Sequence, residues 1–173
     1  SCGSCYNLRY SYHNGSEWVY EDIKDYSSNW AYSNTGRNNQ IKLNSTDVPH
    51  VVFFDDYYDD VYLSVRVNGS WSSSSVDDYG GIYTVYGERA ISLAIDSTDG
   101  LHVAYYDLGG RFLEYAHRGP GESSWTKTNV HDQGGHYIGT SISIAVDSAD
   151  RPHIAYHDRT QWDLEYARFD GSE

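Results

Sequence analysis

The chain has 173 residues, and its 25 acidic and 12 basic side chains give a formal net charge of −13 at pH 7. Nucleic acids and anionic membranes bind basic surfaces, so this charge argues against both as partners. No apolar run approaches the roughly 18 residues that a membrane-spanning helix needs. No signal-peptide pattern is present in these residues. The length favours one domain, residues 1–173, with a real hydrophobic core.

Cys2 and Cys5 are the only cysteines, and they stand close together near the start of the chain. A redox pair or half of a zinc site would need a βαβ pattern or a second cysteine pair, and the sequence has neither. We therefore expect a small structural disulfide between Cys2 and Cys5. A disulfide requires an oxidising compartment, which agrees with a secreted, extracellular or cell-surface protein.

A repeat of about fifty residues, the period of propellers and arrays, runs through the sequence. Equivalent tryptophans recur at intervals of 53 and 54 residues, at Trp18, Trp71 and Trp125. Equivalent histidines recur at intervals of 52 and 51 residues, at His50, His102 and His153. Within a repeat, apolar residues alternate with polar ones, and clusters of Asp, Ser, Asn and Gly interrupt the alternation. This pattern predicts four short antiparallel strands per repeat, here named a, b, c and d in chain order.

In chain order, the first predicted strands are a c–d pair, Asn7–His13 and Trp18–Ile23, joined by the hairpin dipeptide Asn14-Gly15. A long polar loop follows at Asp25–Asn39. The first complete repeat then begins with strands a and b at Ile41–Asn44 and His50–Phe54.

Strand c of this repeat is predicted at Val61–Val67, and the hairpin dipeptide Asn68-Gly69 leads to strand d near residues 71–76. Two more repeats follow, in which residues 77–89 and 131–140 form the d-to-a loops. The predicted units are a partial blade at residues 6–24 and blades at about 39–77, 90–131 and 141–173. The last blade lacks strand d, so the total is thirteen strands, with no substantial helix.

The second and third full repeats resemble a blade that is common in secreted and surface-attached bacterial and archaeal proteins. The match in the second runs over Ser92-Leu93-Ala94-Ile95-Asp96-Ser97, His102, Tyr105, Asp107, Leu113-Glu114-Tyr115-Ala116 and Trp125. The resemblance implies an all-β fold of repeated four-stranded antiparallel blades, as in a β-propeller. An open stack of β-meanders is the alternative. The family has no single activity, so the resemblance implies little about chemistry.

The arrangement of strands predicts an incomplete propeller. The N-terminal pair supplies strands c and d, and the C-terminal unit supplies a, b and c, with an unpaired edge at Leu164–Phe169. We expect Asn7–Ile23 to pair with the rest of a longer parent chain or with the last blade of another copy. In the second case two copies would make a ring of about six blades.

In a propeller, the b–c and d–a loops emerge on the same rim, which gathers aromatic and acidic residues here. Aromatic rings that stack on sugars and carboxylates that bind hydroxyl groups are common in glycan sites. The predicted ligand-binding residues are Trp30, Tyr32, Asp55, Tyr57, Tyr83, Asp107, His136, Tyr137, Asp158 and Trp162. The alternative is that these are turn-forming aspartates and ordinary surface tyrosines.

Three further groups of residues have a competing functional and structural interpretation. The repeated histidines suggest metal ligands or catalytic bases, but a group present in every blade is expected to maintain the blade, by an Asp–His hydrogen bond across the a–b turn. The acidic loop at residues 55–60 suggests Ca²⁺ binding, although it lacks the EF-hand spacing, and we otherwise expect no cofactor. The Asn-x-Ser/Thr sequons at Asn14, Asn44 and Asn68 are candidate glycosylation sites, although Asn14 and Asn68 also suit hairpin turns.

The sequence therefore favours a noncatalytic extracellular module that binds or adheres to glycans or surfaces. No hydrolase, metalloprotease, phosphate-binding or dinucleotide-binding motif is present, so no catalytic residue is predicted. Two alternatives remain. One is a structural subunit of an extracellular assembly or filament, and the other is part of a polysaccharide-degrading propeller enzyme.

Overall fold

The computed structural model describes residues 8–24, 36, 38–55, 60–78, 90–107, 112–131 and 138–170. These residues form thirteen strands and no helix, so the chain is all-β as predicted. No helix of the described residues is available to cross a membrane. All strand pairs are antiparallel and join consecutive strands, in four separate sheets.

The first two sheets contain the N-terminal half of the chain. The N-terminal hairpin pairs β1 (Leu8–His13) with β2 (Trp18–Lys24). Blade one has four strands in sequence order: β3 (Gln40–Leu43), β4 (Pro49–Asp55), β5 (Asp60–Val67) and β6 (Ser70–Asp77).

The other two sheets have the same sequential strand order, and the term blade is used as a label for these sheets. Blade two consists of β7 (Ile91–Ile95), β8 (Leu101–Asp107), β9 (Phe112–Arg118) and β10 (Thr126–His131). Blade three has three strands among the described residues: β11 (Ile138–Val146), β12 (Pro152–Asp158) and β13 (Asp163–Arg168). Strands a, b, c and d of the predicted repeat are thus β3, β4, β5 and β6 in blade one and their counterparts elsewhere.

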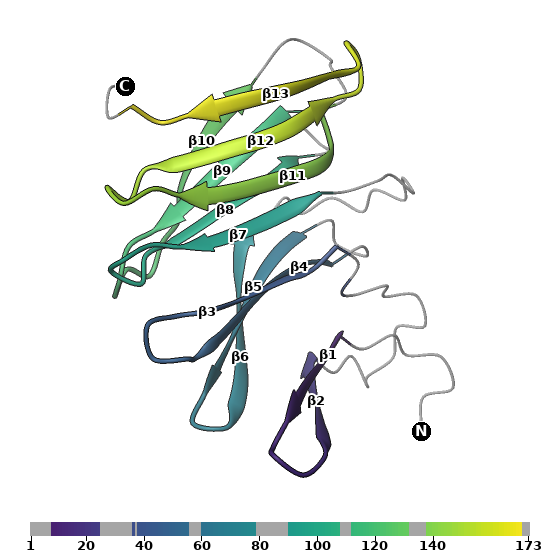
Figure 1. The fold of residues 1–173 in the computed structure, drawn as a ribbon, viewed down its shortest axis with the longest axis vertical. Helices are drawn as coiled ribbons and strands as arrows, with labels where there is room; N and C mark the ends of the chain where they lie inside the picture. The colour runs from purple at the N-terminus through teal and green to yellow at the C-terminus, as the bar shows by residue number, and fades with distance from the viewer. Residues whose placement is uncertain are drawn as a thin grey trace.

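The four sheets follow one another as layers from the N-terminal hairpin to blade three (Figure 1). One apolar cluster fills each space between neighbouring sheets. Leu8 and Ile23 of the hairpin pack on Val51 and Phe53 of blade one. A second cluster joins blades one and two, and a third joins blades two and three. Strands β4 and β8 are buried along their whole length because a layer covers each of their faces.

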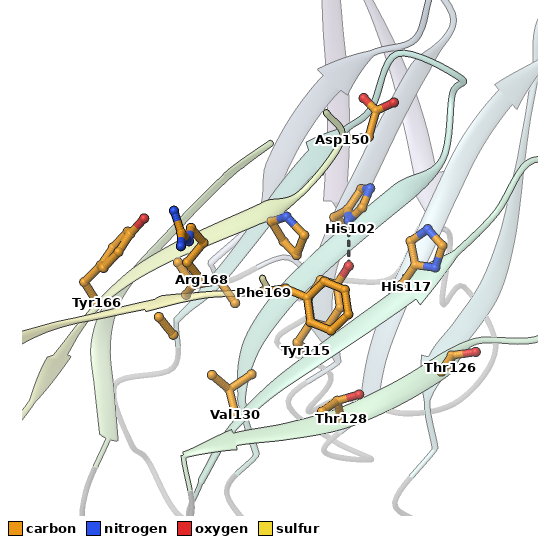
Figure 2. A pocket seen from close by; sticks show the side chains of 13 residues that line it. His102, Tyr115, His117, Thr126, Thr128, Val130, Asp150, Tyr166, Arg168 and Phe169 are labelled. Carbon is orange, nitrogen blue, oxygen red and sulfur yellow. Dashed lines mark hydrogen bonds between the residues drawn. The ribbon is translucent and has the colours of Figure 1, made fainter. Parts of the chain in front are cut away.

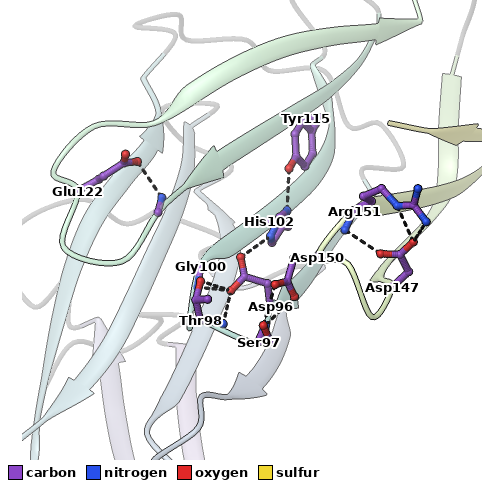
Figure 3. A network of polar contacts seen from close by, with 11 residues as sticks. Asp96, Ser97, Thr98, Gly100, His102, Tyr115, Glu122, Asp147, Asp150 and Arg151 are labelled. Atoms are coloured by element: carbon purple, nitrogen blue, oxygen red, sulfur yellow. Dashed lines mark hydrogen bonds and ion pairs between the residues drawn. The ribbon is translucent and has the colours of Figure 1, made fainter. Parts of the chain in front are cut away.

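The a–b turns are held by the repeated aspartate and histidine, as predicted. In blade two, Asp96 accepts hydrogen bonds from the backbone N–H groups of Thr98 and Gly100, and its other oxygen lies 3.1 Å from His102 Nε2 (Figure 3). Asp147 and His153 repeat the contact in blade three at 3.4 Å. Blade one differs because Asn44 replaces the aspartate, and His50 Nδ1 there lies 2.9 Å from the carbonyl oxygen of Val48.

The charge state of this pair fits a structural role. Burial opposes ionisation of Asp96, but the hydrogen bonds from His102, Gly100 and Thr98 outweigh it and lower the pKa to about 2. Burial lowers the pKa of His102 despite its bond to Asp96. A neutral His102 donates from Nε2 to the carboxylate and accepts from the Tyr115 hydroxyl at Nδ1, 2.7 Å away. Both ring nitrogens are used, which leaves neither for a metal, although Asp96, His102 and His117 cluster closely.

The structure shifts some predicted boundaries. β11 begins at Ile138, inside the predicted 131–140 loop, and its register with β12 shifts between Ile138 and Ile142. His131, at the other end of that loop, closes β10. The described residues do not close into a ring, and β13 forms the outer edge of blade three without a fourth strand.

The sequons have local roles in turns. The side-chain oxygen of Asn14 accepts from the N–H groups of Ser16 and Glu17, and Asn68 has a left-handed backbone with φ of 51°. Asn44 accepts from Thr46 and Val48. The predicted turn chemistry is present, and glycosylation of these asparagines stays a prediction. The predicted Cys2–Cys5 disulfide lies outside the described residues.

Candidate functional site

The predicted loop rim is the edge of the blades where β4, β8 and β12 end. Asp55, Asp107 and Asp158 are the last residues of these strands, and each is buried. Six other predicted site residues lie outside the described residues: Trp30, Tyr32, Tyr57, Tyr83, His136 and Tyr137. The described part of the rim therefore has two features, one around Asp158 and one around Asp107.

Asp158 organises the β12–β13 turn. Its Oδ1 accepts hydrogen bonds from the backbone N–H groups of Thr160 and Gln161, at 2.7 and 3.2 Å. These bonds satisfy a carboxylate that is fully buried. Asp158 thus has the turn-forming role that was the alternative to ligand binding.

Trp162 follows this turn with its ring in solvent. Its side chain is 75% exposed, and its backbone φ is 61°, a conformation that bulky side chains rarely adopt. The ring meets His157 edge-on, with 6.3 Å between ring centroids. Non-glycine residues held in the left-handed region are found at functional sites, where the fold compensates for the strain. The turn therefore presents a large apolar face at the rim.

Asp107 belongs to a cluster of carboxylates between blades one and two. Oxygen atoms of Asp77, Asp107 and Glu114 lie within 4.8 Å of one another. Asp77 closes β6, and the other two residues come from β8 and β9. The Tyr105 hydroxyl donates to Asp77 at 2.8 Å, and the Lys127 ammonium group also contacts Asp77.

The surroundings of this cluster raise the pKa values of Glu114 and Lys127. Burial raises the pKa of Glu114 to about 6, and the negative charges of Asp77 and Asp107 act in the same direction. Lys127 opposes the shift, and its own pKa is raised because its bond to Asp77 outweighs its burial. These surroundings therefore favour the protonated form of Glu114 relative to an exposed glutamate. Three carboxylates could also hold a hard cation such as Ca²⁺, with Lys127 as the competing cation.

The sequence predicted one member of this cluster, Asp107, and missed the others. Asp77 and Lys127 have no counterpart of the same type in the next repeat, where His131 takes the position of Asp77. His131 Nδ1 lies 2.7 Å from the Tyr156 hydroxyl, just as Asp77 bonds the Tyr105 hydroxyl. The structure thus repeats the contact with different residue types, and a search for repeated residues could not find it. Glu114 had a signal, because it recurs as Glu165 in the repeated Leu-Glu-Tyr-Ala segment.

A cavity of about 700 Å³ lies away from the loop rim, between blades two and three. His102, Tyr115 and His117 line it from blade two, and Tyr166, Arg168 and Phe169 line it from blade three (Figure 2). None of these residues is among the predicted ligand-binding residues. The cavity lies beside the a–b turns, and therefore on the opposite side of the blades from Asp107 and Trp162.

No protein-family model matches the chain, and no curated protein is similar to it in sequence. Among solved structures it is similar to AofleA from Arthrobotrys oligospora, with a TM-score of 0.61 and 14% identity over 96% of this chain. An AofleA mutant with three arginines changed to alanine gives a TM-score of 0.60 at 14% identity. The chain spans about half of these proteins, 48% of each. At this identity the likeness shows a shared fold only.

Proposed function

We propose that this chain is a noncatalytic extracellular module of the β-propeller type, which binds glycans at its loop rim. As part of this proposal, the repeats belong to the type of blade found in secreted and surface-attached bacterial and archaeal proteins, which their sequence resembles. It needs no cofactor, although Ca²⁺ at the rim carboxylates is compatible with it. The partners are a glycan or glycan-bearing surface and, as argued below, a second copy of the chain.

The exposed ring of Trp162 is the observation that carries this proposal. Sugar rings present apolar C–H faces that stack on indole, while neighbouring polar groups bind the hydroxyl groups. Asp163 and Arg159 flank the Trp162 turn and are exposed. Because Asp158 fixes this turn, the ring is positioned before the ligand arrives, which reduces the entropic cost of binding.

A glycan array probed with the full chain, followed by calorimetric titration of the best ligand, tests the proposal. Trp162→Ala should weaken binding about tenfold or more, which corresponds to about 1.4 kcal/mol. Trp162→Phe is the matched control, because it keeps an aromatic face at the same position and should retain most of the affinity. Equal affinity of wild type and Trp162→Ala, or a blank array, would contradict glycan binding at this rim.

One observation favours an enzyme as the second candidate. Glu114 is a carboxyl group with a pKa of about 6, beside the carboxylates of Asp77 and Asp107, and retaining glycosidases use two nearby carboxyl groups with unequal pKa. Polysaccharide turnover that disappears in both Glu114→Gln and Asp107→Asn, with both variants folded, would replace the noncatalytic proposal with this one. All three carboxylates are buried, however, which favours a structural role.

A further inference from the structure

The a–b turns of successive blades are linked by a repeated pair of hydrogen bonds. Ser45 in blade one donates its backbone N–H and its hydroxyl to the two oxygens of Asp99 in blade two, at 2.8 and 2.7 Å. Ser97 in blade two makes the same two bonds to Asp150 in blade three, at 2.9 and 2.7 Å (Figure 3). The same contact therefore occurs wherever one blade packs on the next among the described blades.

The two ends of the chain of blades carry the unused halves of this contact. Asp47 in blade one matches Asp99 and Asp150, with φ of 62° against 68° and 59°. Ser148 in blade three matches Ser45 and Ser97. Asp47 and Ser148 are exposed, and neither side chain has a hydrogen-bond partner among the described residues. An acceptor thus remains at one end and its donor at the other.

A second set of contacts, along the first strand of each blade, ends in the same way. Leu93 N–H donates to the Gln40 side chain at 3.0 Å, and Ile144 N–H donates to the Ser92 hydroxyl at 3.1 Å. The next acceptor in this series is Ser143, which is exposed on blade three.

The next donor position in this series is Ile41, at the other end of the chain. The Ile41 and Leu43 side chains are 47% and 54% exposed, whereas Leu93 and Ile144 are 0% and 6% exposed. Blade one thus leaves open an apolar strip that the later blades cover.

The outer face of blade three is the counterpart of a buried face. Ala94 and Leu113 of blade two are 5% and 0% exposed because blade three covers them. Their equivalents in blade three are Ala145, which is exposed, and Leu164, which is 81% exposed.

The cavity between blades two and three also has a counterpart in the chain. At the space between the hairpin and blade one, Trp71 packs edge-on against Tyr10 and donates to Glu21 at 3.1 Å. Tyr10 pairs with Glu21 across the hairpin, as Tyr115 pairs with Thr128 across blade two, and these last two line the cavity.

A tryptophan at the start of a fourth strand would therefore fill this cavity. Trp125 occupies the corresponding position between blades one and two, where it packs against their shared cluster. Trp18 begins β2 and is 60% exposed, so its ring is available to do the same.

We propose that a second copy of this chain docks head to tail, so that blade three of one copy packs on blade one of the other. Ser148 then meets Asp47, Ser143 meets the backbone of Ile41, and Trp18 of the second copy enters the cavity. The second copy's β2 becomes the missing fourth strand beside β13. β13 takes the place of β1 against blade one, because Leu164 and Tyr166 match Leu8 and Tyr10 in sequence. The exchange requires β1 to separate from β2, with which it pairs in the single chain.

A second copy carries the groups that fit these contacts, because the complement of each open group lies at the opposite end of the described part of the chain. Each contact joins unlike surfaces, blade three of one copy and blade one of the other. Two such contacts close a ring of two copies. The surface continues the packing already present between blades. The loop rim stays uncovered, so the glycan proposal and this one can fail independently.

Cysteine pairs test the proposal in the full chain with Cys2→Ser and Cys5→Ser, which remove the native thiols. One chain carries Asp47→Cys and a second carries Ser148→Cys, and the two are mixed and oxidised or treated with a short bis-maleimide. Denaturing electrophoresis should show a two-chain product in the mixture, at least several times more abundant than with either variant alone. Random thiol collisions would give equal amounts in all three samples.

The Ser45→Cys and Asp99→Cys pair in one chain is the matched control, because it places thiols at the same contact within the chain. It should cross-link within one chain and establish that the geometry permits the bond. The proposal is overturned if this control cross-links and the Asp47→Cys and Ser148→Cys mixture does not. Loss of the two-chain product on adding Trp18→Ala to both chains would further support the cavity as the binding site of Trp18.

Discussion

At the scale of single residues, equivalent positions of the repeat carry different residue types that make similar contacts. Asn44 replaces the aspartate of the other a–b turns and still accepts the backbone hydrogen bonds that cap the turn. It cannot hold a histidine by charge, and His50 bonds the Val48 carbonyl instead. The sequence could predict the Asp–His pairs because both members recur at fixed spacing. It could not predict the contact between Asp77 and Lys127, because these residues are fifty positions apart and their types do not recur in the repeat.

The raised pKa of Glu114 leads to a prediction about stability. Its folded pKa of about 6 lies above its usual 4.5, so the folded state favours the protonated form. The resulting stabilisation is fully present below pH 4.5 and is lost as the pH rises through 6, by about 2 kcal/mol in total. Glu114→Gln is uncharged at every pH and should lack this loss.

Urea unfolding of wild type and Glu114→Gln across this pH range measures the effect. The difference in free energy of unfolding between the two proteins should change in favour of the variant as the pH rises, and titrating groups that do not interact with Glu114 cancel in that difference. Parallel pH profiles would show that Glu114 is not held in its protonated form by burial.

At the scale of strands and sheets, alternation and turn residues were sufficient to predict the elements. The thirteen strands and their order follow from period-two patterns separated by Asp, Asn and Gly, and the Asn-Gly dipeptides fix two hairpins. The early start of β11 was not predictable, because its first residues precede a register shift and lack the alternation. The pattern predicted Trp162 on the loop rim, but it did not predict the left-handed backbone at this residue.

The repeated tryptophans predict a contrast between two sites of identical sequence type. Trp125 packs between blades one and two with the Arg118 guanidinium 4.6 Å from its ring centre, whereas Trp18 is 60% exposed. Trp125→Ala should cost about 3 kcal/mol of unfolding free energy. Trp18→Ala should change it by less than about 0.5 kcal/mol in dilute solution.

Chemical denaturation at low protein concentration, where single chains predominate, measures both variants. Raising the concentration should then make Trp18→Ala less stable than wild type, because the variant loses the stabilisation that association provides. Equal losses of unfolding free energy for the two substitutions in dilute solution would contradict the prediction that packing between blades stabilises Trp125 and not Trp18.

At the scale of the whole molecule, the chain is a series of layers with two unlike ends. Blade two has a neighbouring blade on each face, as in other repeat proteins, whereas blades one and three keep exposed apolar groups such as Ile41 and Leu164. The sequence predicted incomplete blades at both ends from strand counts. The sequence did not predict which groups match across those ends. Pairing Ser148 with Asp47, and Trp18 with the cavity, depends on the equivalent contacts between blades in the structure.

Light scattering coupled to size-exclusion chromatography tests most directly the central claim that the ends of this array complete each other. We expect a species of twice 19.6 kDa for the wild-type chain at high concentration, and a species of 19.6 kDa for the variant that combines Trp18→Ala with Asp47→Ala. A wild-type chain that stays soluble at 19.6 kDa over a wide range of concentrations would contradict it.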